Sequence, residues 1–167
     1  LAVERLGRDQ TTLDLLLCEA SSGDCRTWAS QTAPTWVNLG DDFRFLADGG
    51  FLWSDEDSGW RRLARYDALG RRLHPVGPDG WAIASPGALL GDDEAVVATL
   101  FRSEGMGAAD RQVARIDLGD GGLRWIGDGA GWHGAEVDPT GRRWLHSWSD
   151  ADTPTRKRVE TLDGRGI

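Results

Sequence analysis

Hydrophobic and polar positions between Phe43 and Trp81 alternate in short blocks. Four apolar segments are separated by three polar turns, and each turn contains glycine. Segments of this length are typical of β-strands, and glycine or aspartate tolerates the positive φ that tight hairpin turns require. The pattern therefore predicts an antiparallel, four-stranded meander. The segments are Phe43–Ala47, Phe51–Ser54, Trp60–Tyr66 and Arg71–Val76, and the turns are residues 48–50, 55–59 and 67–70.

The same block recurs along the chain. Trp81 and Trp132 each follow a glycine-rich approach and lie 51 residues apart (132 − 81). Arg65–Asp67 resembles Arg115–Asp117 at a spacing of 50 residues (115 − 65). A period of roughly 40–50 residues with four strands in each unit is typical of a β-propeller. A β-sandwich would show similar turn spacing, but it would not explain the matched tryptophans.

The repeats predict an all-β chain, a partial β-propeller of about three and a half four-stranded antiparallel blades. A closed propeller typically has at least four blades. We therefore expect residues 1–167 to be one fragment of a propeller domain, with blade edges open to self-association. Residues 1–10 are not assigned to a strand. The expected blades cover residues 11–30 in part, 36–77, 81–127 and 132–167.

Composition agrees with this fold. The 167 residues include 23 glycines and nine tryptophans, as expected for β-structure with many turns. The net charge of −8 argues against a nucleic-acid partner, because clustered Lys and Arg supply most of that affinity. No apolar run approaches the ~20 residues of a membrane-spanning helix, so no membrane span is expected. The chain begins at Leu1, and we expect it to be cut from a larger protein.

A group of arginines is expected to form a solvated face, because its members fall on and around alternating strand positions. The group consists of Arg61, Arg62, Arg65, Arg71 and Arg72.

Two cysteines, Cys18 and Cys25, flank a polar segment that is expected to form a hairpin loop. Cross-strand neighbours at such a loop can approach disulfide distance. Two buried free thiols are the more ordinary alternative when the compartment is not known, so both states stay open. The spacing does not fit a zinc site, and no paired histidines support one. We expect no metal and no cofactor.

A run of aromatic, glycine and aspartate positions extends from Thr35 to Gly70. It comprises Thr35–Asn38, Phe43–Leu46, Asp48–Gly49, Phe51–Ser54, Ser58–Trp60, Leu63, Tyr66–Asp67 and Gly70. This run resembles the propeller of the dipeptidyl peptidase IV family, among the prolyl oligopeptidases, and its bacterial members in particular. Gly80–Trp81 with Ile83 resembles the start of the following blade, and Leu145–Ser147 to Pro154 resembles the last blade. The order and spacing of these motifs over nearly the whole chain are more specific than any single motif.

The resemblance implies a position and a function. In this family an eight-bladed propeller lies over an α/β-hydrolase domain with a Ser-Asp-His triad, and the enzymes release dipeptides from peptide N-termini. The chain resembles the C-terminal part of the N-terminal propeller domain, so the hydrolase domain is expected downstream and would be its intramolecular partner. The full-length protein is expected to be a periplasmic or secreted serine-type dipeptidyl peptidase that acts on peptide substrates.

The chain itself is expected to be inactive and to restrict access and position peptide N-termini. The sequence has no Gly-x-Ser-x-Gly nucleophile elbow. His74, His133 and His146 are each expected to be surface or structural residues. Glu56 falls in a blade loop and is not matched to the glutamate pair that binds the substrate amine in the family.

Asn38, Asp41 and Asp42 are the candidate substrate-proximal residues. In the family, the connection after a Trp-Val pair lies near the active-site cavity, and here that connection is Asn38–Asp42. A carboxylate of Asp41 or Asp42 would add negative potential that attracts a peptide ammonium group. A solvated loop between blades is the alternative.

Two other functions stay open. A stand-alone propeller could bind proteins or peptides without an attached enzyme, and the nine tryptophans could form a carbohydrate-binding surface. Buried blade positions explain the tryptophans better, because glycan binding would need several of them exposed in one groove. A Gly-x-Ser-x-Gly sequence followed by Asp and His downstream in the gene would favour the peptidase.

Overall fold

The computed structural model describes residues 1–91, 93–105, 109–127 and 129–162, and within these ranges it contains strands and turns but no helix. The strands pair in four antiparallel sheets, each made of consecutive strands. The first sheet has β1 (Ala2–Leu6), β2 (Thr12–Cys18) and β3 (Cys25–Thr32), and the second has β4 (Arg44–Phe45), β5 (Phe51–Asp55), β6 (Arg62–Tyr66) and β7 (Arg72–Val76). The third has β8 (Trp81–Leu90), β9 (Ala95–Arg102), β10 (Gln112–Asp117) and β11 (Leu123–Gly127), and the fourth has β12 (Trp132–Val137), β13 (Arg143–Ser149) and β14 (Arg156–Thr161).

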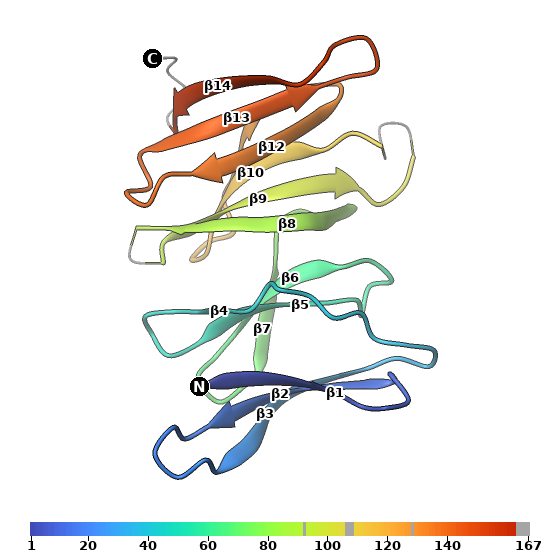
Figure 1. The fold of residues 1–167 in the computed structure, drawn as a ribbon, viewed down its shortest axis with the longest axis vertical. Coiled ribbons are helices and arrows are strands. Elements are labelled where there is room, and N and C mark those ends of the chain that lie inside the picture. The colour runs from blue at the N-terminus through green and yellow to red at the C-terminus, as the bar shows by residue number, and fades with distance from the viewer. Residues whose placement is uncertain (92, 106–108, 128, 163–167) are drawn as a thin grey trace.

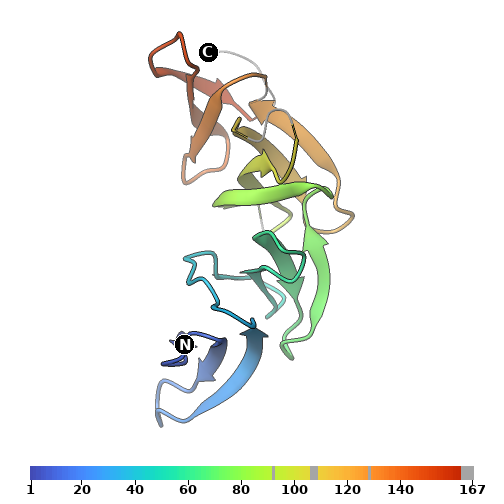
Figure 2. The same ribbon diagram turned by 90° about the vertical axis from the view of Figure 1, so that its right-hand side faces the viewer.

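The four sheets follow one another along the longest axis of the molecule (Figure 1). Seen after a quarter turn, the row of sheets is curved, and the first and last sheets lie at opposite ends (Figure 2). Sheets of three, four, four and three strands arranged in an open arc correspond to about three and a half propeller blades. The prediction of an all-β partial propeller is therefore confirmed.

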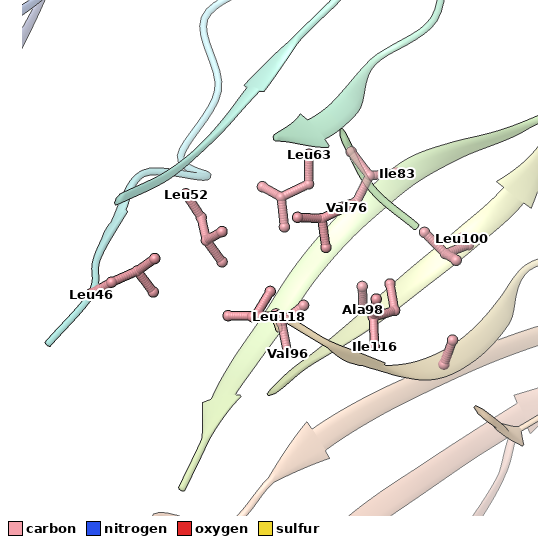
Figure 3. Close-up of a cluster of buried hydrophobic side chains, with 11 residues drawn as sticks. Leu46, Leu52, Leu63, Val76, Ile83, Val96, Ala98, Leu100, Ile116 and Leu118 are labelled. Atoms are coloured by element: carbon pink, nitrogen blue, oxygen red, sulfur yellow. The ribbon is translucent and has the colours of Figure 1, made fainter. Parts of the chain in front are cut away.

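Hydrophobic cores fill the interfaces between neighbouring sheets. The core between the second and third sheets includes Leu52, Leu63, Val96 and Ile116 (Figure 3). The interface between the first and second sheets contains Leu13, Leu15, Trp28, Phe51, Trp53 and Tyr66, and that between the third and fourth contains Leu90, Val97, Val113, Trp144 and Leu162. Each sheet is thus held by the burial of apolar side chains against its neighbour in the row.

Strand β5 shows why the interior strands are apolar on both sides. Phe51 and Trp53 belong to the core shared with the first sheet, whereas Leu52 belongs to the core shared with the third. Successive side chains of a strand point to opposite faces, so a strand between two sheets buries every position. Strand β9 repeats the arrangement, with Val96 on one face and Val97 on the other.

The observed bounds correct two expectations. The first sheet begins at β1, in residues that the sequence pattern left unassigned, so it starts at Ala2 rather than at residue 11. β4 is only two residues long. β8 continues through Pro86 to Leu90, because irregularities in its pairing with β9 at 83–85 and 86–88 accommodate the proline. The predicted end of the last blade, residues 163–167, lies outside the described residues.

Cys18 and Cys25 are joined by a disulfide. They are the last paired residues of β2 and β3 before the hairpin loop, and their Cα atoms lie 4.0 Å apart. The sequence left open whether the two cysteines are bonded or free, and in the structure they are bonded.

The two rims of the sheet row differ. One rim, which we call the loop rim, carries the β3–β4 linker (33–43), the β5–β6 loop (56–61), the β9–β10 connection and the β13–β14 loop (150–155), on the right in Figure 1. The opposite turn rim carries the tight turns, including 47–50, 67–71 and 138–142. Long connections concentrate on one rim, and binding residues are commonly found on such loops.

Candidate functional site

The β3–β4 linker positions Asn38, Asp41 and Asp42 at the loop rim. Two backbone hydrogen bonds attach the linker to the first sheet, from Ala33 N to Thr11 O at 3.0 Å and from Val37 N to Gln10 O at 2.7 Å. The Val37 side chain is buried in the core between the first and second sheets. Val37 therefore anchors the linker at the start of the segment that carries the candidate residues.

Asp42 is completely buried and is bound by Arg61. Arg61 Nε donates to Asp42 Oδ2 at 2.8 Å, and Arg61 Nη2 donates to Oδ1. Arg61 Nε also lies 3.3 Å from Ser54 Oγ. A buried carboxylate needs such a partner. Asp42 is therefore one half of an internal ion pair. Its partner compensates the negative charge that was expected to attract a ligand.

Asp41 is the exposed acid of the linker. Its side chain is fully open to solvent, and its Oδ1 lies 4.0 Å from Arg61 Nη2. At that distance and exposure the pair contributes little to stability. Asp41 is thus the linker carboxylate available to a ligand.

Asn38 connects the linker to the β5–β6 loop. Its Nδ2 donates to both carboxylate oxygens of Glu56 at 3.0 Å. Glu56 is exposed, as the sequence indicated, but it also fixes the linker. Beside this contact lies a cavity of about 250 Å³ lined by Gln31, linker residues, Glu56 and Asp57.

Glu4 of β1 interacts electrostatically with Asp41 and Asp42, and we call these three residues the acidic cluster. The sequence analysis did not identify Glu4. Its Oε1 accepts a hydrogen bond from Trp53 Nε1 at 2.8 Å. Burial raises the pKa of Glu4, the charges of Asp42 and Asp41 raise it further, and the Trp53 hydrogen bond and Arg61 act in the opposite direction. The alternation of Ala2, Glu4 and Leu6 was the available signal, because it places Glu4 on the apolar face of β1.

The arginine group is only partly the expected solvated face, because Arg71 and Arg72 are exposed whereas Arg61, Arg62 and Arg65 are partly buried. Each member pairs with an aspartate, most of them in loops or turns. The pairs are Arg61–Asp42, Arg62–Asp79, Arg65–Asp48, Arg71–Asp67 and Arg72–Asp55. The arginines therefore fix loops and turns on the second sheet, and Arg61 does so at the candidate site.

The cluster offers negative charge and hydrogen-bond acceptors, which suit a cationic ligand such as an ammonium group. Within the described residues, no group of three or more His, Cys, Asp or Glu side chains could hold a metal ion, and no helix is long and apolar enough to cross a membrane. His133 and His146 lie elsewhere, between the third and fourth sheets, where they contact each other and Glu160.

The exposed tryptophans are spread over the molecule. Trp36 is 60% exposed on the linker and Trp132 is 54% exposed at the start of the fourth sheet, so two sheets separate them. Trp60 packs edge-on against Phe101, and Arg111 lies 4.3 Å from the ring centre of Trp132. This distribution does not favour a single carbohydrate-binding groove.

The fold is similar to solved bacterial structures. Dipeptidyl peptidase 4 of Porphyromonas gingivalis matches 98% of this chain with a TM-score of 0.85 and 20% identity, over 23% of its own length. A putative dipeptidyl aminopeptidase IV of Bacteroides ovatus matches 98% of this chain with a TM-score of 0.80 and 13% identity, over 26% of its length. The chain thus corresponds to about a quarter of each structure.

Curated relatives match over a much shorter stretch. The probable M18 family aminopeptidase 2 of Mycobacterium bovis strain BCG is 45% identical over 38 residues, which is 23% of this chain and 9% of that protein. The same protein of Mycobacterium tuberculosis matches equally. So short a match carries no argument about function.

The family match extends over most of the chain. Residues 1–155 match the family described as the dipeptidyl peptidase IV (DPP IV) N-terminal region. The matched residues include all of the first three sheets as well as the linker that carries Asp41. This chain belongs to the family of the dipeptidyl peptidase IV N-terminal region.

Proposed function

We propose that the chain is a non-catalytic propeller segment of a dipeptidyl peptidase IV-like serine exopeptidase, in which it restricts access to the active site and positions peptide N-termini. The observation that carries the proposal is the exposed carboxylate of Asp41 on a linker that is fixed on both sides. Val37 holds the linker before Asp41, and the Asp42–Arg61 pair holds it after. The family of the chain supplies the reaction class.

A fixed, exposed carboxylate can attract the ammonium group of a peptide N-terminus. The charge of Asp42 behind it is paired with Arg61, so Asp41 is the linker acid that carries this role. Interactions between exposed charges are worth about 0.2–1 kcal/mol. The contribution of Asp41 would therefore appear in the binding of substrate rather than in the chemical step.

The catalytic residues are proposed to lie in another part of the full-length protein. The sequence lacks a Gly-x-Ser-x-Gly elbow, and an α/β-hydrolase domain is the proposed intramolecular partner. The first and fourth sheets each present one face without a neighbouring sheet among the described residues. We propose that these faces contact further blades in the full-length protein, and that in isolation they allow self-association.

A periplasmic or secreted location belongs to the same proposal. Disulfides persist mainly in oxidising compartments. The Cys18–Cys25 bridge supports such a compartment.

The test is Asp41→Asn in the full-length protein, assayed on dipeptidyl chromogenic substrates. KM should rise about two- to five-fold with kcat unchanged, as expected for an exposed charge. Asp24→Asn is the matched control, because it removes the same charge from the hairpin on the turn rim. An unchanged kcat/KM for Asp41→Asn would remove the substrate-positioning role.

The isolated chain supplies a second test. It should have no peptidase activity, and turnover by it would contradict the non-catalytic assignment. A full-length protein that binds peptides without hydrolysing them would instead make the chain part of a stand-alone binding module.

A further inference from the structure

The fourth sheet presents a row of polar and aromatic side chains to the third sheet. Residues directly opposite each other in an antiparallel pair share a face. His133 lies opposite Trp148, which lies opposite Arg156, and His146 lies opposite Arg158. Trp144 and Ala135 share this face and pack in the core with residues of the third sheet. The row therefore runs from the interface between the two sheets, where His133 and Trp144 are buried, out to the exposed Arg156 and Arg158.

A chain of hydrogen bonds runs through this interface. His146 Nδ1 lies 3.0 Å from Glu160 Oε1, and His146 Nε2 lies 2.9 Å from His133 Nδ1. Arg158 Nε donates to the same Glu160 oxygen at 2.7 Å, and Arg158 Nη2 forms an ion pair with that oxygen at 2.6 Å. The pKa of Glu160 is lowered by the hydrogen bonds from His146 and Arg158, which outweigh burial. The Glu160 carboxylate, at one end of this series of hydrogen bonds, is therefore ionised at neutral pH.

Packing holds the two imidazoles in place. The ring of His146 stacks on Trp144 at a centroid distance of 4.6 Å and on His133 at 5.1 Å. Gly127 of β11 closes the other side, because a Cβ there would lie 3.0 Å from His146 Nε2 and 3.5 Å from His133 Nδ1. The imidazole pair is therefore packed between Trp144 and the backbone of β11.

A cavity of about 690 Å³ opens beside the pair at the loop rim. It is lined by His133, His146, Trp148, Asp150, Arg156 and Arg158, together with Lys157 and the backbone region of 129–130. We propose that this cavity is a binding site for a small oxyanion, a phosphate or carboxylate group, and that protonation of the histidine pair strengthens binding. The site lies two sheets away from Asp41, so it is independent of the function proposed above.

The charges around the cavity explain the dependence on protons. Arg158 pairs with Glu160, and Arg156 and Asp150 both line the cavity, so these four charges sum to zero when the imidazoles are neutral. One carboxylate oxygen of Asp150 already has a partner, because its Oδ1 accepts a hydrogen bond from Asp152 N at 2.9 Å. Each proton that an imidazole gains makes the cavity more positive.

Lys157 also lines the cavity and adds a positive charge, which Glu136 partly offsets. Lys157 lies opposite Ser147 on the other face of the sheet, where its Nζ is 3.9 Å from Glu136 Oε1. Arg124 of β11 donates to Leu162 O. Arg111 stacks on Trp132 and lines a separate cavity that His133 also borders.

The two protons of the pair have different consequences. With one added proton, the His146 ring can donate both to Glu160 and to His133, so the chain of hydrogen bonds is kept. A second proton would place two cations side by side, because both facing nitrogens would then be donors. A bound oxyanion offsets that repulsion, and by linkage the anion must therefore bind more tightly at lower pH.

NMR of the imidazole Cε1–H signals tests the proposal, because the chain has only three histidines. The protein is titrated with inorganic phosphate, sulfate and acetate at constant ionic strength at pH 5.5 and pH 8.0. Saturable shifts are expected for His133 and His146, with binding at least about ten-fold tighter at pH 5.5. His74 on β7 of the second sheet is the internal reference and should not shift. Saturation by phosphate and sulfate alone would identify a phosphate-type site, and saturation by acetate would identify a carboxylate site.

Arg156→Ala distinguishes a site from general charge effects, because Arg156 is exposed and its removal should not prevent folding. It should weaken binding at pH 5.5 about five-fold. Arg142→Ala removes an equal charge from the opposite rim of the same sheet and should bind as the unchanged protein does. The proposal is overturned if no anion gives a saturable shift, if His74 shifts equally, if affinity is the same at both pH values, or if the two arginine variants bind alike.

Discussion

Arg61 binds both carboxylate oxygens of Asp42, 19 residues earlier in the chain. The carboxylate is completely buried, and the side chain of Arg61 is 30% exposed. The backbone oxygen of Arg61 also accepts a hydrogen bond from Ile83 N at 2.8 Å. One residue therefore connects the linker that leaves the first sheet, the start of β6, and β8 of the third sheet.

Asp42→Asn should destabilise the protein by about 3 kcal/mol, because it leaves Arg61 without its charge partner in a largely buried place. Urea unfolding followed by tryptophan fluorescence measures the difference. Asp41→Asn is the matched control, and it should change the free energy of unfolding by less than about 0.5 kcal/mol, since that carboxylate is exposed. Equal losses in the free energy of unfolding would show that the buried pair of Asp42 stabilises the protein no more than the exposed carboxylate does.

Removal of the disulfide should have a moderate effect. The double variant Cys18→Ser, Cys25→Ser should lose about 2 kcal/mol, because the bridge closes a loop with a sequence separation of only seven residues. Urea unfolding under oxidising conditions measures it, and unfolding of the unchanged protein with a reductant is the control. A variant as stable as the oxidised protein would mean that the hairpin is held by its backbone pairing alone.

The fold could be predicted from the sequence because the sheets repeat. Each interior strand lies between two sheets and is apolar at successive positions, as at Phe51–Trp53, and each turn carries glycine or aspartate. β1 escaped prediction because Glu4 and Arg5 interrupt its pattern. The structure explains both: Glu4 accepts from Trp53, and Arg5 pairs with Asp14.

The candidate site could be predicted only in part. The linker and its acids were found, but which acid is exposed depends on partners elsewhere in the chain. Asp41 and Asp42 are neighbours of the same type, and only the approach of Arg61 buries one of them. The histidine pair was likewise hidden, because His133, His146 and Glu160 come together through the register of three strands.

Gly70→Ala should be strongly destabilising. Gly70 lies in the β6–β7 turn with φ of 82°, and an added Cβ would lie 1.9 Å from the backbone oxygen of Trp28 in the first sheet. The indole of Trp28 also donates to Ala68 O at 3.1 Å in the same turn. The variant combines an unfavourable φ with a clash between sheets, and we expect a loss of about 3 kcal/mol or more.

Gly59→Ala separates the two causes. Gly59 has nearly the same φ, 84°, but a Cβ there would meet no atom within 4 Å. It should cost only about 1 kcal/mol, the cost of the backbone conformation. Thermal unfolding of both variants measures the contrast, and similar losses would argue against the close approach of Trp28 to the turn.

Asp67→Asn should remove part of the acid sensitivity of the fold. The hydrogen bond from Arg71 N holds the pKa of Asp67 below its ordinary value of 3.8, aided by the Arg71 side chain and by Leu69 N. Because the folded protein binds this proton less readily than the unfolded chain, the stabilisation is complete above about pH 4 and is lost as the pH falls through the lower folded value. Asp48 and Asp117 have lowered pKa values for the same reason, a backbone hydrogen bond in their turns.

Melting temperatures from pH 7 to pH 2.5 should therefore show Asp67→Asn less stable than the unchanged protein at pH 7, with a gap in melting temperature that narrows below about pH 4. Asp24→Asn, which removes a charge from a hairpin tip, should follow the unchanged protein throughout, and a constant gap for Asp67→Asn would show that ionised Asp67 does not stabilise the turn.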